Sequence, residues 1–155
     1  ESSRILSKKY SKWQFYIAGT LNYKKDNNFF KKKNNQKNIK FLGYHKKIYN
    51  LFNQSSIVCL PSYREGFPKS LIEASASGCA IVTTDVTGCR DAIIENFNGY
   101  LCKPKNVKSL VTKLDILIKN KKIREKFSKN SRKLALSKYD VKIFVKRNLL
   151  NYTFK

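Results

Sequence analysis

Short apolar runs alternate along this chain with stretches in which apolar residues recur at helical spacing. Runs rich in Ile, Val, Leu and Phe predict buried strands, and a spacing of three or four residues predicts amphipathic helices. The predicted strands cover residues 13–19, 39–43, 56–60, 80–84 and 100–102. The predicted helices cover residues 2–12, 45–53, 68–77, 90–96, 107–118, 123–138 and 141–152, and residues 24–40 are expected to hold a short helix and a solvated loop.

Strands that alternate with helices at short spacing predict an α/β fold, a doubly wound, Rossmann-like parallel sheet with helices at its C-terminal end. Ligands of such sheets bind beyond the carboxyl ends of the strands. Four segments follow predicted strands and are expected to converge on one rim: Gly19-Thr20, Gly43-Tyr44, residues 61–67 and residues 86–90.

Length and composition indicate one globular domain over residues 1–155, because 41% of the residues are hydrophobic and the chain is too short for two sizeable cores. No apolar run approaches the roughly 20 residues that span a bilayer. The chain lacks methionine and begins with Glu1, so we expect it to be part of a longer protein. Its four cysteines form no Cys-x-x-Cys pair, so neither a zinc site nor a disulfide framework is expected.

The net charge of +23 leaves three interpretations open. One is a basic face that binds nucleic acid, and another is attraction to an anionic cytoplasmic membrane leaflet, which we favour over nucleic acid. Lys and Asn are also favoured, like Ile, Phe and Tyr, by an A/T-rich coding sequence, and their spread along the chain fits that third interpretation.

Candidate chemistry is concentrated between Glu65 and Glu73, which flank a predicted transition from loop to helix. Pro68 suits the first helical position, and Gly66 allows a ligand to approach the backbone. The amides of residues 69–71 would then be free at a helix N-terminus, which attracts anions. Carboxylates accept hydrogen bonds from sugar hydroxyls, so the segment meets the needs of a nucleotide-sugar site.

The stretch from Leu60 to Gly78, followed by Ala80 to Asp91, resembles the C-terminal domain of retaining family 4 glycosyltransferases with the GT-B fold. That family carries two glutamates at this spacing in this context. The resemblance implies that Glu65 is catalytic and contacts the donor sugar, and that Glu73 binds the ribose. It further implies donor-binding roles for the residues between the two glutamates: Gly66, Phe67, Pro68, Lys69, Ser70 and Leu71.

Residues that follow other strands complete the expected donor site. Gly19 is expected to pass close to the diphosphate, and Gly43 and Tyr44 to frame the nucleobase. Arg90 is expected to contact a phosphate or to pair with Glu65, and Asp91 to help cap the helix that begins there.

The resemblance implies a hexosyltransferase that transfers a sugar from a nucleotide sugar, by our interpretation a UDP-hexose or UDP-N-acetylhexosamine, to a glycan or lipid-linked acceptor. Its setting would be bacterial cell-envelope polysaccharide synthesis, such as that of lipopolysaccharide, in the cytoplasm or at the inner face of the plasma membrane. No metal or other cofactor is expected, because the sequence has no Asp-x-Asp cluster.

Two parts of such an enzyme have no counterpart in this sequence: the N-terminal acceptor domain, and the Arg and Lys that clamp the diphosphate in the family. We therefore expect the chain alone to bind the donor weakly and to catalyse no measurable transfer.

Two other classes of function remain open: a non-catalytic nucleotide-binding module, and a basic nucleic-acid-binding domain. The second would need a helix-turn-helix or stacked aromatic signature, which the sequence lacks.

Overall fold

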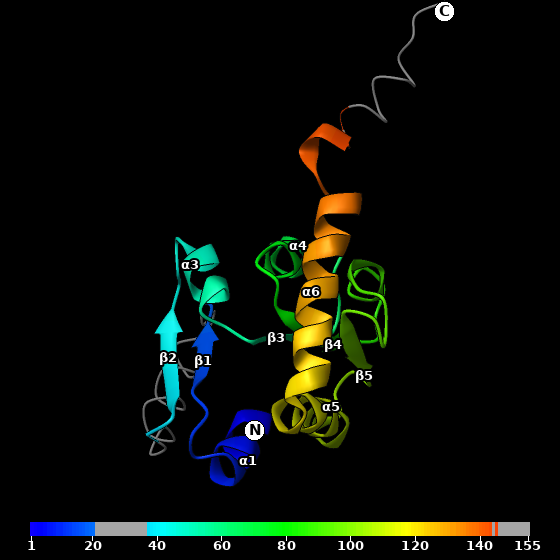
Figure 1. Ribbon diagram of the computed structural model, residues 1–155. Coiled ribbons are helices and arrows are strands. Elements are labelled where there is room, and N and C mark those ends of the chain that lie inside the picture. Colours follow the sequence, from blue (N-terminus) through cyan, green and yellow to red (C-terminus); the bar gives the residue numbers. More distant parts are fainter. Residues whose placement is uncertain (21–36, 144, 146–155) are drawn as a thin grey trace, which may run out of the picture. The chain divides into compact units, whose positions relative to one another are not determined.

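The computed structural model describes residues 1–20, 37–143 and 145 of the chain. These residues form two compact units, Glu1–Ile48 and Tyr49–Lys155, which we call unit 1 and unit 2 and describe separately (Figure 1). Each unit holds its own parallel sheet, with β1 and β2 in unit 1 and the order β3-β4-β5 in unit 2.

The described residues of unit 1 form helix α1 (Ser2–Lys9) and strands β1 (Phe15–Ala18) and β2 (Ile39–Gly43). Leu6 and Ile39 are the buried apolar side chains among these described residues. The buried side chain of Asn38 ties the helix to the sheet, because its amide nitrogen lies 3.1–3.3 Å from the carbonyl oxygens of Ser7, Tyr10 and Trp13.

The two strands of unit 1 end together. The amide of Gly19 donates to the carbonyl of Gly43 at 2.8 Å, and both glycines have positive φ, which suits residues without a Cβ. The connection between β1 and β2 runs through residues 21–36, so most of the segment predicted as a short helix and loop lies outside the described residues.

Unit 2 alternates strands and helices as the sequence predicted. The order is α3 (Ile48–Asn53), β3 (Ile57–Leu60), α4 (Lys69–Ala76), β4 (Ala80–Thr84), the 3-10 turn η1 (Arg90–Ala92), β5 (Gly99–Cys102), α5 (Val107–Lys119) and α6 (Lys121–Lys138). Helix α3 begins at the last residue of unit 1. The helix predicted over residues 141–152 is described only at residues 141–143 and 145, which are helical.

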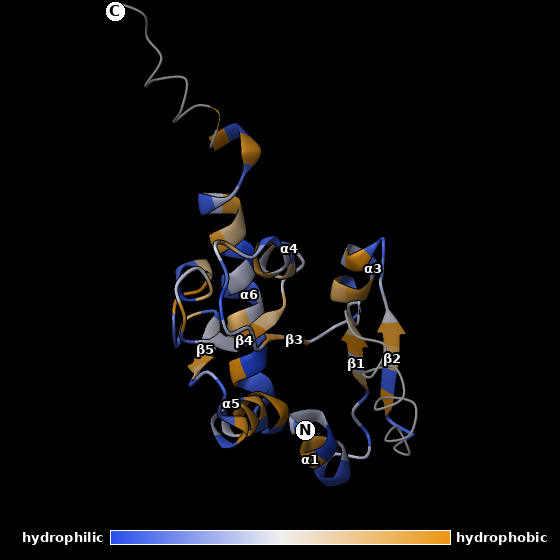
Figure 2. Cartoon of the chain, turned by 180° about the vertical axis from the view of Figure 1, so that it is seen from behind, coloured by the Kyte–Doolittle hydropathy of each residue, from blue (hydrophilic) through white to orange (hydrophobic). Residues whose placement is uncertain are grey.

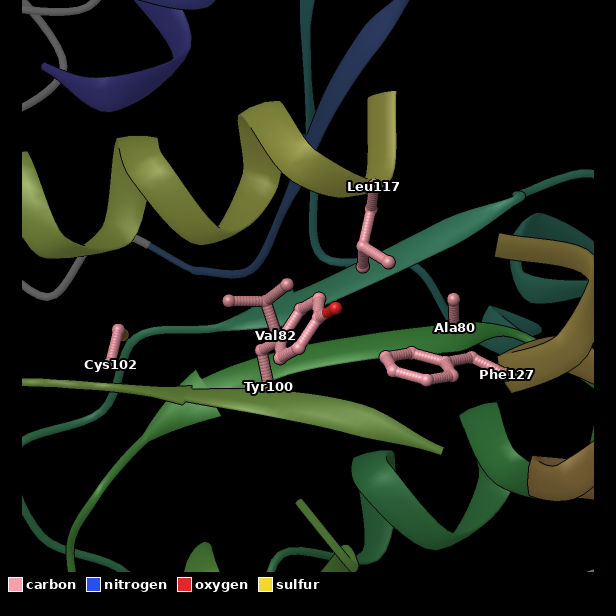
Figure 3. Close-up of a cluster of buried hydrophobic side chains, with 6 residues drawn as sticks. All are labelled: Ala80, Val82, Tyr100, Cys102, Leu117 and Phe127. Carbon is pink, nitrogen blue, oxygen red and sulfur yellow. The ribbon is translucent and has the colours of Figure 1, made fainter. Parts of the chain in front are cut away.

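The core of unit 2 lies on β4, all five residues of which are buried. Successive strand residues point to opposite faces, so Ala80 and Val82 share one face with Tyr100 of β5. Figure 3 shows this face meeting Leu117 of α5 and Phe127 of α6, while the ribbon of α4 runs on the other side of the sheet. Tyr100 and Phe127 meet edge to face, with ring centroids 5.0 Å apart. Each large side chain buried here stabilises the fold by roughly 1.5–3 kcal/mol.

The helix predicted over residues 90–96 is wrong in length, because only the 3-10 turn Arg90–Ala92 forms. Ile93 is extended, and the Asn98 side-chain oxygen accepts the amide of Ile94 at 2.7 Å. The Ile94 amide would have bonded to a backbone carbonyl in a longer helix. Its bond to Asn98 instead holds the chain in the turn that precedes β5.

Candidate donor-binding site

The loop after β3 carries Glu65, and two hydroxyl groups fasten the start of that loop. Thr83 Oγ1 donates to the carbonyl of Leu60 at 2.8 Å, and Thr84 Oγ1 donates to the carbonyl of Ser62. Both threonines are buried in β4. The central strand therefore fixes where the chain leaves β3, at the carboxyl edge of the sheet.

Ser62 in turn holds the Glu65 carboxylate, because Ser62 Oγ donates to Glu65 Oε1 at 2.6 Å. Glu65 is half-buried. A carboxylate held by one hydroxyl in this way keeps further lone pairs for the hydroxyls of a ligand. The sequence analysis named Glu65 but not Ser62. A hydroxyl three residues before a glutamate could have indicated this hydrogen bond.

The turn after β4 lies directly against the same loop. A Cβ built on Gly88 would stand 2.2 Å from the carbonyl oxygen of Gly66 and 2.5 Å from that of Glu65. Only a glycine permits this approach, and its φ of 82° also favours glycine. Two of the segments that were expected to meet on one rim, residues 61–67 and 86–90, are therefore brought together within unit 2.

Helix α4 begins at Lys69, one residue later than predicted, and Pro68 is its N-cap with φ −75° and ψ 108°. The prediction that residues 69–71 all offer free amides is wrong for Leu71, which donates to the carbonyl of Pro68 at 3.0 Å. Within the described part of the chain, the amides of Lys69 and Ser70 have no backbone acceptor. These two amides, together with the positive end of the helix dipole, are therefore available to bind an anion.

Lys69 and Glu73 lie one turn apart on α4 and are both exposed. The opposite face of the helix buries Leu71, Ala74 and Ser75. No ion pair of Glu73 occurs among the described residues, so the prediction of Glu73 as an available carboxylate stays open.

Phe67 contacts a residue that the sequence did not link to the loop. Its ring meets that of Tyr139 edge to face at 5.9 Å, and Tyr139 Oη lies 3.4 Å from the carbonyl oxygen of Asp91. Tyr139 follows α6 and gave no local sequence signal. Aromatic pairs of this geometry add about 0.5–1.5 kcal/mol beyond the burial of area.

Arg90 does not pair with Glu65. Its Nε lies 2.5 Å from Asp85 Oδ1 in an exposed ion pair. The Asp91 carboxylate accepts the amide of Gly88 at 3.2 Å, so it braces the turn instead of capping a longer helix. The alternative in which Arg90 contacts a phosphate stays a prediction.

Gly19 and Gly43 lie at the carboxyl ends of β1 and β2 in unit 1, and Tyr44 follows with 74% of its surface exposed. Their convergence with the loops of unit 2 on one rim stays a prediction.

Three further observations bear on the site. The described residues contain no group of three His, Cys, Asp or Glu side chains that could hold a metal ion. A surface hollow of about 610 Å³ lies at the other end of α4, between Ser77 and Lys129, away from the loop. No helix among the described residues is long and apolar enough to cross a membrane.

The parallel sheets flanked by helices match the C-terminal domain of GT-B glycosyltransferases. The C-terminal domain of LpcC, a group 1 glycosyl transferase from Francisella tularensis, superposes with a TM-score of 0.79 and 31% identity, over 90% of this chain and 76% of that one. A TarM variant from S. aureus, in complex with fondaparinux, alpha-GlcNAc-glycerol and UDP, superposes with a TM-score of 0.85 and 25% identity, over 99% of this chain and 31% of that one.

The model of the family "Glycosyl transferases group 1" matches residues 1–134, and the chain belongs to this family. A curated relative from Campylobacter jejuni, N,N'-diacetylbacillosaminyl-diphospho-undecaprenol alpha-1,3-N-acetylgalactosaminyltransferase, is 40% identical over 114 residues. The match covers 74% of this chain and 30% of the relative. The chain therefore spans less than half the length of the curated relatives it matches first.

Proposed function

We propose that this chain is the donor-binding part of a retaining glycosyltransferase, which transfers a sugar from a nucleoside diphosphate to a lipid-linked or glycan acceptor. The observation that carries the proposal is the loop from β3 to α4. It presents the Glu65 carboxylate, held by Ser62, just before a helix start with two amides that lack an acceptor among the described residues.

The donor chemistry follows from these groups. In transfer, the bond between the anomeric carbon and the β-phosphate oxygen breaks, and the acceptor oxygen forms the new bond on the same face while its proton passes to the departing phosphate. The amides of Lys69 and Ser70 are suited to stabilise the negative charge that develops on that phosphate. Glu65 is suited to the sugar hydroxyls and Glu73 to the ribose hydroxyls, since carboxylates accept strong hydrogen bonds.

Relatives support the choice of donor and acceptor. The C. jejuni relative and an Escherichia coli relative, which is 25% identical over 120 residues, both carry a diphosphate-linked undecaprenol acceptor in their names. The E. coli name specifies UDP-galactose, and the TarM variant contains UDP. We therefore propose a uridine diphosphate sugar and an acceptor of cell-envelope polysaccharide synthesis, and we expect transfer to need no metal.

Calorimetric titration of the purified chain with UDP and GDP, at two salt concentrations, tests the proposal. We expect weak binding that prefers UDP and that falls about tenfold or more in Glu73→Ala, because hydrogen bonds to a charged group contribute about 1.5–3 kcal/mol. Glu125→Ala is the matched control, since Glu125 is an exposed glutamate on α6 that pairs only at the surface with Lys121.

Two results would contradict the proposal. Equal affinity for both nucleotides, unaffected by Glu73→Ala, would mean that the carboxylate takes no part in nucleotide binding. Selective binding of the nucleotide, with no transfer even when an acceptor-binding domain is restored, would favour a non-catalytic nucleotide-binding module.

A further inference from the structure

Four lysines form a straight line along α6. Lys122, Lys126, Lys129 and Lys133 follow one another at intervals of four, three and four residues, and all four are exposed. Residues at these intervals share one face of a helix, and this set spans about 17 Å of its length. We call this set the lysine stripe.

The lysine stripe lies opposite the face that holds α6 in the fold. The buried residues of the helix are Phe127, Ser131, Leu134 and Ala135, and they pack inward. Figure 2 shows hydrophilic stretches along the ribbon of α6. The lysines are therefore not needed to hold the helix against the sheet.

Acidic side chains do not neutralise the stripe. The one glutamate of α6, Glu125, lies 3.6 Å from Lys121, which is not part of the line. Among the described residues, none of the four stripe lysines has an ion pair. The positive charges of these four lysines are therefore available to bind an anionic partner.

Exposed apolar side chains continue the line where the lysines end. Leu136 follows Lys133 by three residues, on the same face, and half of its surface is exposed. Beyond the helix, Val141 and Val145 are 72% and 45% exposed. A cluster of lysines on an amphipathic helix attracts anionic lipids, and exposed aliphatic side chains beside it add apolar contact with the bilayer interface.

We propose that the lysine stripe and Leu136 dock on an anionic membrane surface. A straight row of ammonium groups matches a planar layer of lipid phosphates, and long lysine stems reach charged head groups while aliphatic side chains enter the interface. A single-stranded nucleic acid would use aromatic side chains for stacking, and α6 exposes none along its fully described length. This inference goes beyond the donor site, because it uses none of the residues assigned to that site.

Binding of the full chain to vesicles tests the proposal. The vesicles contain phosphatidylcholine alone or mixed with phosphatidylglycerol, and bound protein is measured by co-flotation at low and high salt. We expect binding only to the anionic vesicles, weakened by salt, since each lysine near such a surface is worth about fivefold in partitioning. Replacement of all four stripe lysines by Gln should therefore lower partitioning by about 600-fold, fivefold for each lysine.

The control variant removes four positive charges from exposed lysines outside the stripe. Lys8, Lys12, Lys37 and Lys40 are exposed in unit 1, and their replacement by Gln should leave most of the binding. Leu136→Ser should lower the fraction of binding that survives high salt, because that fraction reports apolar contact. Equal losses in the two four-lysine variants would overturn the proposal and indicate attraction by net charge alone.

Two further readouts keep the result clear. Stripe-dependent binding to a homopolymer RNA, without binding to anionic vesicles, would overturn the proposal in favour of a nucleic acid. UDP titration of the stripe variant should match that of the unchanged chain, so failure of the membrane surface and failure of the donor site are distinguishable. Circular dichroism of each variant checks that the fold is retained.

Discussion

At the scale of single residues, the contact between Gly88 and the Glu65–Gly66 peptide decides the shape of the candidate site. We predict that Gly88→Ala lowers the free energy of unfolding by about 2–4 kcal/mol. The new Cβ would overlap the Gly66 carbonyl oxygen, and φ at this position is positive. Urea unfolding followed by far-ultraviolet circular dichroism measures the loss.

Gly66→Ala is the matched control for this prediction. A Cβ on Gly66 would meet no atom within 4 Å, and φ there is not positive. We expect that substitution to change the free energy of unfolding by less than about 1 kcal/mol. Similar losses in both variants would contradict the close approach of Gly88 to the loop.

Single residues also show how much of the candidate site could be predicted from the sequence. The two glutamates and the start of the helix were predictable because they lie within one short segment. Gly88 and Tyr139 were not named as neighbours of this segment, because they contact it from parts of the chain that are distant in the sequence. Ser62 lies only three residues before Glu65, so its contact was open to prediction but was not recognised. The expected pairing of Arg90 with Glu65 failed because Asp85, five residues before Arg90 in the chain, offers a carboxylate 2.5 Å away.

At the scale of elements, one residue separates α5 from α6. The amide of Asn120 donates to the carbonyl of Ile116 at the end of α5, and its side chain accepts the amide of Ile123 at 3.0 Å in α6. Arg124 reinforces the junction from within α6, because its Nη1 lies 2.6 Å from the carbonyl oxygen of Leu117.

We predict that Asn120→Ala lowers the free energy of unfolding by about 1 kcal/mol, because the amide of Ile123 loses its acceptor. Asn120→Asp keeps the acceptor and should cost little, since a negative charge is favourable at a helix N-terminus. The urea midpoints of the two variants provide the comparison. If Asp and Ala cost the same, the side chain of Asn120 does not cap α6.

The helices show which boundaries a sequence can fix. The helix predicted over residues 68–77 is α4, and its C-cap is Ser77, the last predicted residue. Gly78 follows with φ 71°, and the amides of Gly78 and Cys79 donate to the carbonyls of Ser75 and Ala74 in a Schellman motif. The start of α6 was placed two residues late, because apolar periodicity begins at Ile123 whereas the cap is Asn120. Capping residues thus locate helix ends better than periodicity does.

At the scale of the whole molecule, the predicted parallel α/β class is confirmed by the match to GT-B C-terminal domains. Local patterns were sufficient for this class, since each strand is a short apolar run and each helix has a buried stripe. The division into two sheets could not be predicted, because strand pairing depends on contacts between segments that are distant in the sequence. Nor could composition alone have located the lysine stripe, which depends on which face of α6 is buried.

Cys79 is buried in unit 2 and affects its stability at alkaline pH. Its thiol contacts the carbonyl oxygens of Phe52 and Ser55 at 3.2 and 3.3 Å, and burial raises its pKa from 9.0 to about 11.

We predict that Cys79 makes unit 2 less stable as the pH rises from 9 towards 11. Below pH 9 the thiol is protonated in both the folded and the unfolded chain, so its full contribution is present. Above pH 9 the thiol ionises first in the unfolded chain, which stabilises the unfolded state. The free energy of unfolding therefore falls by about 2–3 kcal/mol by pH 11. The difference in unfolding free energy between the unchanged chain and Cys79→Ala, measured in urea at pH 8 and at about pH 10.5, isolates this effect because the lysines are common to both. A difference that stays constant over this range would show that the thiol has an ordinary pKa and that its burial does not oppose ionisation.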